Sequence, residues 1–430
     1  MVRLAVISLL TFPCLLLAEV APSLLVLSKT ESKLSIIDLE TLQVKATVPT
    51  GNSPHEVCVS ADGNTAFVAD YGASVPGSTI TMIDIPAAKV IRTIDIAPLR
   101  RPHGIGEFQG KIYFTSETSA AIGRYDPAED KVDLIVGTGQ QGSHMLAIDP
   151  ADGRIYTTNI GSDSVSAIDP QRGPGGSALT SHCDVAGQPE GIALSPDGRE
   201  LWAGPRLPGQ KISIVETAGD TVKQTIDFDG VPIRMTFTPD GSKVLVSDAK
   251  NHSLVVFDAK TKERVGEIKV DEIPIGCIIT ADGSKAFVSC AAAHKVVAVD
   301  LKEMKVIGSI DAGATPDGIA IAQARPAVTP RKPGMLGAQL ENLGGADVGR
   351  LKLASTQGVM VVNPTPNSPA AAAGLKPDDV IVSINGAPVL NVQNFVRKLQ
   401  RASAGDELTF DIVRDGEKQA VTVKLAPRPG

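Results

Sequence analysis

The chain has 430 residues, of which 43% are hydrophobic and 21% charged, so it is long enough for two or three globular domains. Its formal net charge is −7, with no basic run and no interleaving of basic and aromatic residues, which argues against nucleic-acid binding. Aromatic residues are only 3% of the chain, so its cores must be built from Val, Ile, Leu and Ala, a composition that favours strands.

The first 18 residues have the pattern of a secretory signal peptide. Arg3 supplies a positive start, an apolar run extends from Leu4 to Leu17, and Ala18 offers a small residue for cleavage. This run is short for a membrane span, although an uncleaved anchor is the alternative interpretation. We therefore expect a periplasmic or extracellular protein with no transmembrane segment after signal removal.

Four cysteines follow the signal, and an exported protein can form disulfides. Cys58, Cys277 and Cys290 lie in apolar strand patterns, where a free cysteine acts as a small core residue. Cys277 and Cys290 flank one hairpin, so a bridge between them is the alternative. Cys183 completes the set.

One phrase recurs seven times between residues 55 and 325, in forms such as HEVCVSADG, EGIALSPDG and IGCIITADG. The glycines that end six of the phrases are 47, 43, 45, 43 and 42 residues apart, a period that indicates a propeller or a solenoid. Each period contains four short strand patterns and no helical one, which favours four-stranded propeller blades. The glycines are Gly63, Gly110, Gly153, Gly198, Gly241 and Gly283.

The ends of the repeat region predict how the ring closes. Strand patterns at 24–27, 34–37 and 44–48 precede the first phrase, whereas the last phrase, at 318–322, has no outer strands after it. We expect this last strand to join the first three in one shared blade. The predicted fold of residues 22–323 is a seven-bladed β-propeller.

The repeat region resembles the YVTN family of β-propeller repeats. The resemblance is carried by FVADYG at 67–72, YTTNIG at 156–161 and VSDAKN at 246–251, and it covers roughly residues 20–325. It implies a seven-bladed ring but no particular chemistry, because propellers serve many unrelated functions.

Polar side chains recur at the start of the inner strands. His55, His103 and His144 begin three successive inner strands, and Glu190 and Asp317 occupy matching places in two others. Converging at one channel mouth, these five residues could hold a divalent metal, the one cofactor considered, or polarise water for hydrolysis or redox chemistry.

An alternative interpretation of these residues requires no metal. A channel mouth is wet, so polar residues there need no ligand. Ile233 and Ile275 stand at the matching place in two repeats, and Arg234, beside the first, is a cation that a metal cage should avoid.

Residues 324–333, ARPAVTPRKP, read as a semi-rigid proline-rich linker, and residues 334–428 as a second, α+β unit. In this unit Ser368 should cap a short helix that Gly374 ends, and residues 391–402 have helical spacing. The other expected elements are strands at 336–340, 358–362, 380–384, 408–414 and 420–425.

This unit resembles the bacterial form of the PDZ domain, through MLGAQL, GVMVVNPTPNSPAAAAGLKPDDVIVSINGAPV and FDIVRDG. The family usually carries Gly where Asp378 stands. Such domains often follow a trypsin-like protease, but the chain has no GNSGG or G-x-S-x-G phrase, so we predict no catalytic residues.

The PDZ resemblance implies that a peptide adds as a strand along 336–340, while the backbone N–H groups of 334–337 hold its terminal carboxylate. Phe395 and Leu399 are equally consistent with lining the groove and with filling the core. The implied peptide-binding residues are Gly334, Met335, Leu336, Gly337, Ala338, Phe395, Val396 and Leu399.

Two functions follow from the sequence. The first is an exported binding protein, whose PDZ unit captures peptide C-termini or strand edges and whose propeller face binds an unknown ligand. The alternative is a metal-dependent hydrolase or redox protein that uses the histidine cluster.

Overall fold

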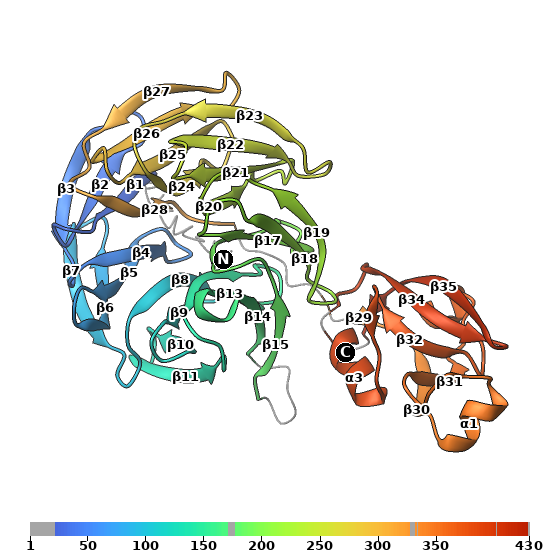
Figure 1. Cartoon of the computed structure of the whole chain (residues 1–430). Coiled ribbons are helices and arrows are strands. Elements are labelled where there is room, and N and C mark those ends of the chain that lie inside the picture. The colour runs from blue at the N-terminus through green and yellow to red at the C-terminus, as the bar shows by residue number, and fades with distance from the viewer. Residues whose placement is uncertain (1–21, 171–176, 327–331, 333, 401, 429–430) are drawn as a thin grey trace, which may run out of the picture.

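The computed structural model describes residues 22–170, 177–326, 332, 334–400 and 402–428, and the chain is nearly all β (Figure 1). The segment predicted as a signal peptide and six of the ten residues of the predicted linker lie outside these described residues. None of the helices in the described ranges is both long and apolar enough to span a membrane.

Seven four-stranded antiparallel sheets are arranged in a ring within the described residues (Figure 1). The seven inner strands, β4, β8, β12, β16, β20, β24 and β28, each lie beside the next around the central channel. The seven-bladed propeller predicted from the repeat period is thus the observed fold, and we name each blade by its inner strand.

Six blades are formed by consecutive strands, ordered from the channel outward. The first three are β4 Pro54–Val59, β5 Thr65–Gly72, β6 Pro76–Asp84 and β7 Lys89–Asp95; β8 Pro102–Phe108, β9 Lys111–Ser116, β10 Ala121–Asp126 and β11 Lys131–Gly137; and β12 Ser143–Ile148, β13 Ile155–Asn159, β14 Ser164–Asp169 and β15 Leu179–Asp184, with a 3-10 turn at Ile160–Ser162.

The other three are β16 Pro189–Leu194, β17 Glu200–Pro205, β18 Lys211–Glu216 and β19 Thr221–Asp227; β20 Pro232–Phe237, β21 Lys243–Asp248, β22 Ser253–Asp258 and β23 Arg264–Lys269; and β24 Pro274–Ile279, β25 Lys285–Cys290, β26 Lys295–Asp300 and β27 Lys305–Ile310.

The seventh blade joins the two ends of the propeller sequence. Its order is β28 Pro316–Ala322, β1 Ser23–Ser28, β2 Lys33–Asp38 and β3 Val44–Pro49, and Leu25 pairs with Ala320. Leu24 and Val26 pack in one cluster with Phe287 of the neighbouring blade. The predicted shared blade is confirmed, and burial of its apolar side chains closes the ring.

The described cysteines Cys58, Cys183, Cys277 and Cys290 are free. Across the β24–β25 hairpin, Cys277 faces Val288, while Cys290 faces Pro274. The alternative disulfide between Cys277 and Cys290 is therefore not formed.

The C-terminal unit contains a sheet of order β30-β31-β32-β34-β35, with β33 beside β32, and a separate β29–β36 pair. Its core packs Phe395 against Phe410, with ring centroids 5.8 Å apart. The elements are β29 Gly334–Met335, β30 Ala338–Asn342, α1 Gly345–Arg350, β31 Val359–Pro364, α2 Pro369–Ala372, β32 Val380–Ile384, β33 Ala387–Pro388, α3 Val392–Leu399, β34 Glu407–Arg414, β35 Glu417–Lys424 and β36 Ala426–Pro427.

Local sequence explains the two expected helices. Ser368 caps α2 by accepting the Ala371 N–H, and Asn391 caps α3 by accepting the Asn394 N–H. Helix α1 was not predicted, because its six residues, GADVGR, bury no side chain and show no apolar period.

Two aspartates after α2 have opposite environments. Asp379 is fully buried and accepts two hydrogen bonds from the Arg414 guanidinium, both 2.6 Å, and one from the Lys376 N–H. Asp378 is exposed, pairs with Arg350 at 2.7 Å, and has φ of +69°. Glycine adopts this backbone conformation freely, which explains why the PDZ resemblance led us to expect glycine there.

The propeller and the C-terminal unit touch at the β16 blade (Figure 1). Arg199 donates a hydrogen bond to Asp406 at 3.2 Å, and Ala218 packs against the core of the C-terminal unit. These contacts position the second domain beside one edge of the ring.

Candidate functional site

One end of the propeller channel opens into a cavity of about 570 Å³, and two tiers of side chains line it. The first tier is the second residue of each inner strand, and in six of the seven blades a proline precedes it. The repeat therefore places one variable side chain per blade at the same depth of the channel. The tier consists of His55, His103, His144, Glu190, Ile233, Ile275 and Asp317.

The second tier consists of residues at or directly after the end of the second strand of a blade. Six of the seven blades contribute such a residue to the lining of the same cavity. The sequence analysis missed this tier, although its position also repeats. The residues are Lys29, Tyr71, Glu117, Ile160, Arg206 and Ala249.

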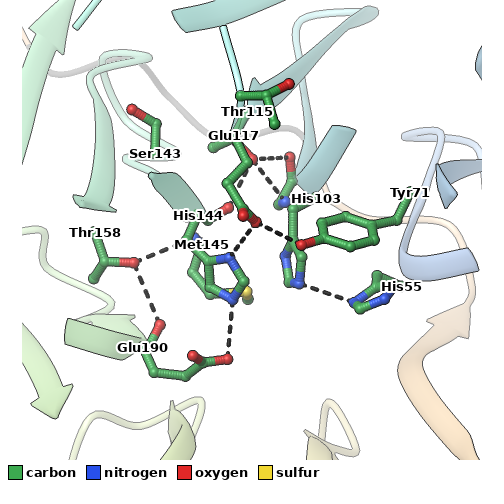
Figure 2. Close-up of polar contacts among 12 residues, drawn as sticks. His55, Tyr71, His103, Thr115, Glu117, Ser143, His144, Met145, Thr158 and Glu190 are labelled. Atoms are coloured by element: carbon green, nitrogen blue, oxygen red, sulfur yellow. Dashed lines mark hydrogen bonds and ion pairs between the residues drawn. The ribbon is translucent and has the colours of Figure 1, made fainter. Parts of the chain in front are cut away.

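All five predicted metal-site residues therefore meet in one cavity, but their side chains bond to one another. His144 lies between two carboxylates (Figure 2): its Nδ1 is 3.1 Å from Glu117 Oε2 and its Nε2 is 2.9 Å from Glu190 Oε1. Ionised carboxylates only accept hydrogen bonds, so both ring nitrogens carry protons and His144 is an imidazolium.

The electrostatics agree with a charged His144. Burial lowers its pKa, but the charge of Glu190 and the hydrogen bond to Glu117 outweigh burial, and the pKa is raised. Burial by itself raises the pKa of Glu190. The charge and hydrogen bond of His144, and then the charge of Arg234, outweigh burial and lower this pKa to about 2. The pKa shifts of His144 and Glu190 therefore both favour the ionised pair.

His103 and His55 are neutral neighbours of this ion network. Burial lowers the pKa of His55 to about 2 and that of His103 well below its usual value. His103 stacks on His144 with ring centroids 3.7 Å apart, and its Nε2 is 3.1 Å from His55 Nδ1 (Figure 2).

Asp317 lies beside these two rings. Burial raises its pKa to about 6, and its Oδ2 lies 3.5 Å from His55 Nδ1. The contact between His55 Nδ1 and His103 Nε2 needs one hydrogen, which either ring can carry.

Tyr71 and Arg234 extend the network on two sides. The Tyr71 hydroxyl donates to Glu117 at 2.9 Å. Arg234 donates to Glu56 Oε1 through Nε at 3.1 Å and Nη2 at 2.6 Å, and its Nη1 lies 3.5 Å from Glu190. Arg234 lines the cavity itself, so the cation that a metal cage should avoid lies within the candidate site.

Among the described residues, no three His, Cys, Asp or Glu groups are placed to hold one metal ion. His144 has no free lone pair, because both nitrogens donate to carboxylates, and His55 and His103 face each other. The predicted residues converge, but this arrangement favours a hydrogen-bonded lining, and the metal stays a prediction.

The second candidate site is the free edge of the C-terminal sheet. β30 is its edge strand, and α3 runs antiparallel beside it. At one end the Val392 N–H donates to Asn342 Oδ1 at 2.8 Å, and at the other the Gly334 N–H donates to the Ala402 carbonyl at 2.9 Å. An extended segment can add to an edge of this kind.

The loop before β30 holds its carbonyls inward. The Leu336 carbonyl accepts from the Ala370 N–H, and the Gly337 carbonyl accepts from the Thr365 N–H and the Ser368 hydroxyl. The Leu336 and Gly337 N–H groups have no acceptor in the part of the chain that the structure describes. They are free to bind a carboxylate.

The backbone conformation requires glycine at position 337. The observed φ is +72°, and a Cβ would lie 2.4 Å from Ser368 Cβ, so the backbone itself requires glycine.

The α3 side chains divide between core and surface. Phe395 is fully buried in the core, which favours the core interpretation of the two that the sequence left open. Val396 is 38% exposed and Leu399 is half-buried. Val396 and Leu399 remain the candidates on this helix for contacting a bound side chain.

Comparison with known proteins supports the assignment of the C-terminal unit as a PDZ domain. A PDZ domain family model matches residues 334–425. The chain is 29% identical over 123 residues to a probable periplasmic serine endoprotease DegP-like of Bartonella henselae, which is 26% of this chain and 24% of that protein. It is 34% identical over 83 residues to Protease Do-like 1, chloroplastic, of Arabidopsis thaliana, 17% of this chain and 19% of that protein.

The chain thus spans less than a quarter of the length of these proteases, and the similarity lies in the PDZ part. It is also 24% identical over 241 residues to Antigen Lp49 of Leptospira interrogans, covering 52% of this chain and 42% of that protein.

Solved structures match the propeller. A functionally unknown protein from Desulfotomaculum acetoxidans has a TM-score of 0.59 at 15% identity, covering 72% of this chain and 99% of that one. A putative 6-phosphogluconolactonase from Bacteroides fragilis has a TM-score of 0.59 at 14% identity, covering 70% and 98%. At this level of identity the likeness concerns the fold alone.

Proposed function

We propose that this chain is an exported, non-enzymatic binding protein whose PDZ domain captures the C-terminus or an exposed strand of a partner protein. The propeller then acts as a rigid disc that presents the PDZ domain and offers a second binding face. The observation that carries the proposal is the open edge of β30 in a domain that matches the PDZ family model.

The chemistry of the edge supports this function. Backbone groups of β30 can pair with an extended peptide whatever its sequence, because every residue offers the same N–H and carbonyl. The Leu336 and Gly337 N–H groups are the candidates for binding a terminal carboxylate, and Val396 and Leu399 for contacting its last side chain.

Peptide titration tests this function. Fluorescein-labelled ten-residue peptides that end in Val, Ala or Phe are titrated with the chain from residue 19 onward, and anisotropy is measured. We expect saturable binding that weakens at least tenfold when the terminal carboxylate is amidated. Val396→Asp should also weaken it at least tenfold, because it charges the surface beside the peptide.

A matched control uses the other edge of the sheet. Thr422→Asp places the same charge on β35, where its side chain is exposed, and binding should not change. Equal affinity for acid and amide peptides, or no effect of Val396→Asp, would contradict capture of a C-terminus at β30.

Export rests on the pattern of residues 1–18 and is tested separately. The full chain is expressed in a Gram-negative bacterium and its N-terminus is sequenced from the periplasmic fraction. We expect a chain that begins at Glu19. A chain that keeps its first 18 residues in the membrane or the cytoplasm would overturn export as a cleaved protein.

A further inference from the structure

The cavity at the channel mouth has unused hydrogen-bond donors. Lys29 Nζ is 3.7 Å from its nearest acidic partner, Asp317 Oδ2, and Arg206 Nε is 3.8 Å from Glu190 Oε2. Both separations exceed a hydrogen bond, and neither side chain makes one with the described residues. Both cations are partly exposed on the cavity wall.

A ring nitrogen without a partner lies deeper. His103 is 2% exposed, lines the cavity, and its Nδ1 has no hydrogen-bond partner among the described atoms. In the tautomer whose Nε2 accepts from His55, this Nδ1 carries the hydrogen. A buried N–H without an acceptor costs about 1–3 kcal/mol, which a ligand oxygen can recover.

One oxygen of each glutamate in the cavity is already used. Glu117 Oε2 accepts from Tyr71 and His144, and Glu190 Oε1 accepts from His144 and Arg234. Ligand groups that face Lys29 and Arg206 bind best when they are anionic.

The cavity also has apolar side chains. Ile233 and Ile275 of the first tier line it, together with Ile160 and Ile273. An anion that fills the cavity therefore gains from carrying an apolar body. The volume of about 570 Å³ is typical of a site for a small molecule.

From these contacts we infer that the channel mouth binds a small organic carboxylate with a short apolar chain. The carboxylate accepts hydrogen bonds from Lys29, Arg206 and His103, and the chain packs against the isoleucines. This site is independent of peptide capture at β30, so either proposal can fail alone.

Calorimetric titration with butanoate, hexanoate and hexanamide tests the inference, with inorganic phosphate as the anion without an apolar body. We expect hexanoate to bind one equivalent, with affinity falling about fourfold for each methylene removed. Hexanamide and phosphate should bind at least tenfold more weakly than hexanoate.

Single variants locate the site. Arg206→Gln and Lys29→Gln should each weaken hexanoate binding at least fivefold. Lys250→Gln is the matched control: it removes a cation beside Ala249 of the cavity wall, but this amine pairs with Asp229 at 2.5 Å and does not line the cavity. Thermal unfolding of each variant checks that the ring is intact.

Four binding results would overturn the inference. They are no saturable binding of any carboxylate, equal binding of acid and amide, phosphate binding as tightly as hexanoate, and hexanoate binding that neither Arg206→Gln nor Lys29→Gln weakens. A fifth outcome, a stoichiometric metal that is lost with His103→Ala, would overturn it in favour of the enzymatic alternative.

Discussion

The two candidate sites of this protein are built from different parts of the chain. The channel mouth consists of side chains, one from each of seven inner strands with a second tier behind them, whereas the PDZ edge consists mainly of backbone groups of β30 and its preceding loop. A repeat position can change from His to Ile without disturbing the blade, so the propeller site can change its chemistry easily. The backbone of β30 cannot change, so under the proposed function the peptide specificity of this edge would depend on a few neighbours such as Val396.

The two regions also differ in how they are held together. The propeller depends on contacts between the ends of its sequence, while the PDZ domain depends on local caps and a buried ion pair. The following predictions test this difference, from the largest effect to the smallest.

Deleting residues 22–50 should abolish folding of the propeller, because β1–β3 form most of the shared blade. The expected loss is the whole stability of the ring, more than about 5 kcal/mol. Trp202, the one tryptophan of the chain, is fully buried in β17 of another blade and reports this event.

In the deletion variant the Trp202 emission should shift to the red as the residue meets water. Emission that stays at the native wavelength would mean that the blades fold independently. This result would contradict cooperative folding of the ring.

Asp379→Asn should lower the free energy of unfolding of the PDZ domain by about 3 kcal/mol, because it leaves Arg414 without its buried carboxylate. Scanning calorimetry should show the PDZ transition moved and the propeller transition unchanged. Asp378→Asn, which alters only the exposed pair with Arg350, should change stability by less than about 0.5 kcal/mol. Equal effects of the two variants would contradict this assignment.

The stability of the propeller should depend on pH through the hydrogen-bonded network around His144. Its folded pKa is raised above the ordinary 6.5, so its contribution to stability is fully present below pH 6.5 and is lost as pH rises through the raised value. The pKa of Glu190, lowered from 4.5 to about 2, gives stability that is lost as pH falls from 4.5 towards 2. The pKa of His55 is also lowered to about 2, so the folded state loses stability as pH falls below 6.5.

The variant His144→Gln isolates the first of these terms. Its propeller melting temperature should lie below that of the unaltered protein at pH 6, and the difference should shrink as pH rises towards 9. A difference that is constant with pH would show that His144 contributes by packing alone.

The smallest effect is expected at Asp378. Asp378→Gly removes the left-handed backbone strain and an exposed ion pair, and should raise PDZ stability by about 0.5 kcal/mol. Asp378→Ala loses the same pair but keeps a Cβ at φ of +69°, so it should be about 1 kcal/mol less stable than the glycine variant. Chemical denaturation followed by hydrogen exchange of the PDZ amides measures both.

Much of the fold was predictable because it is repetitive or locally encoded. The period of the glycine turns gave seven blades, and the missing outer strands after residue 322 gave the shared blade. Ser368 and Gly374 bounded α2 through capping chemistry alone. Helix α1 could not be predicted, because nothing in GADVGR distinguishes a short surface helix from a loop.

The candidate site was predicted in part. His55, His103 and His144 were found through their place in the repeat, but their protonation depends on groups from other strands. Glu117 and Glu190, which make His144 an imidazolium, approach it from two different blades. Tyr71, Glu117 and Arg206 repeat at the end of the second strand, and aligning that position would have found them. The burial that separates Phe395 from Val396 depends on tertiary packing.

The shared blade has a consequence for the order of events in synthesis. β1 emerges from the ribosome first, yet its inner partner β28 follows almost the whole propeller sequence. Until then the inner edge of β1 stays unpaired and open to wrong pairing. A nascent chain that ends before residue 316 should therefore remain sensitive to protease, and one that extends past residue 322 should become resistant. In this protein the last strand of the propeller to be made is the one that holds the first strand in place.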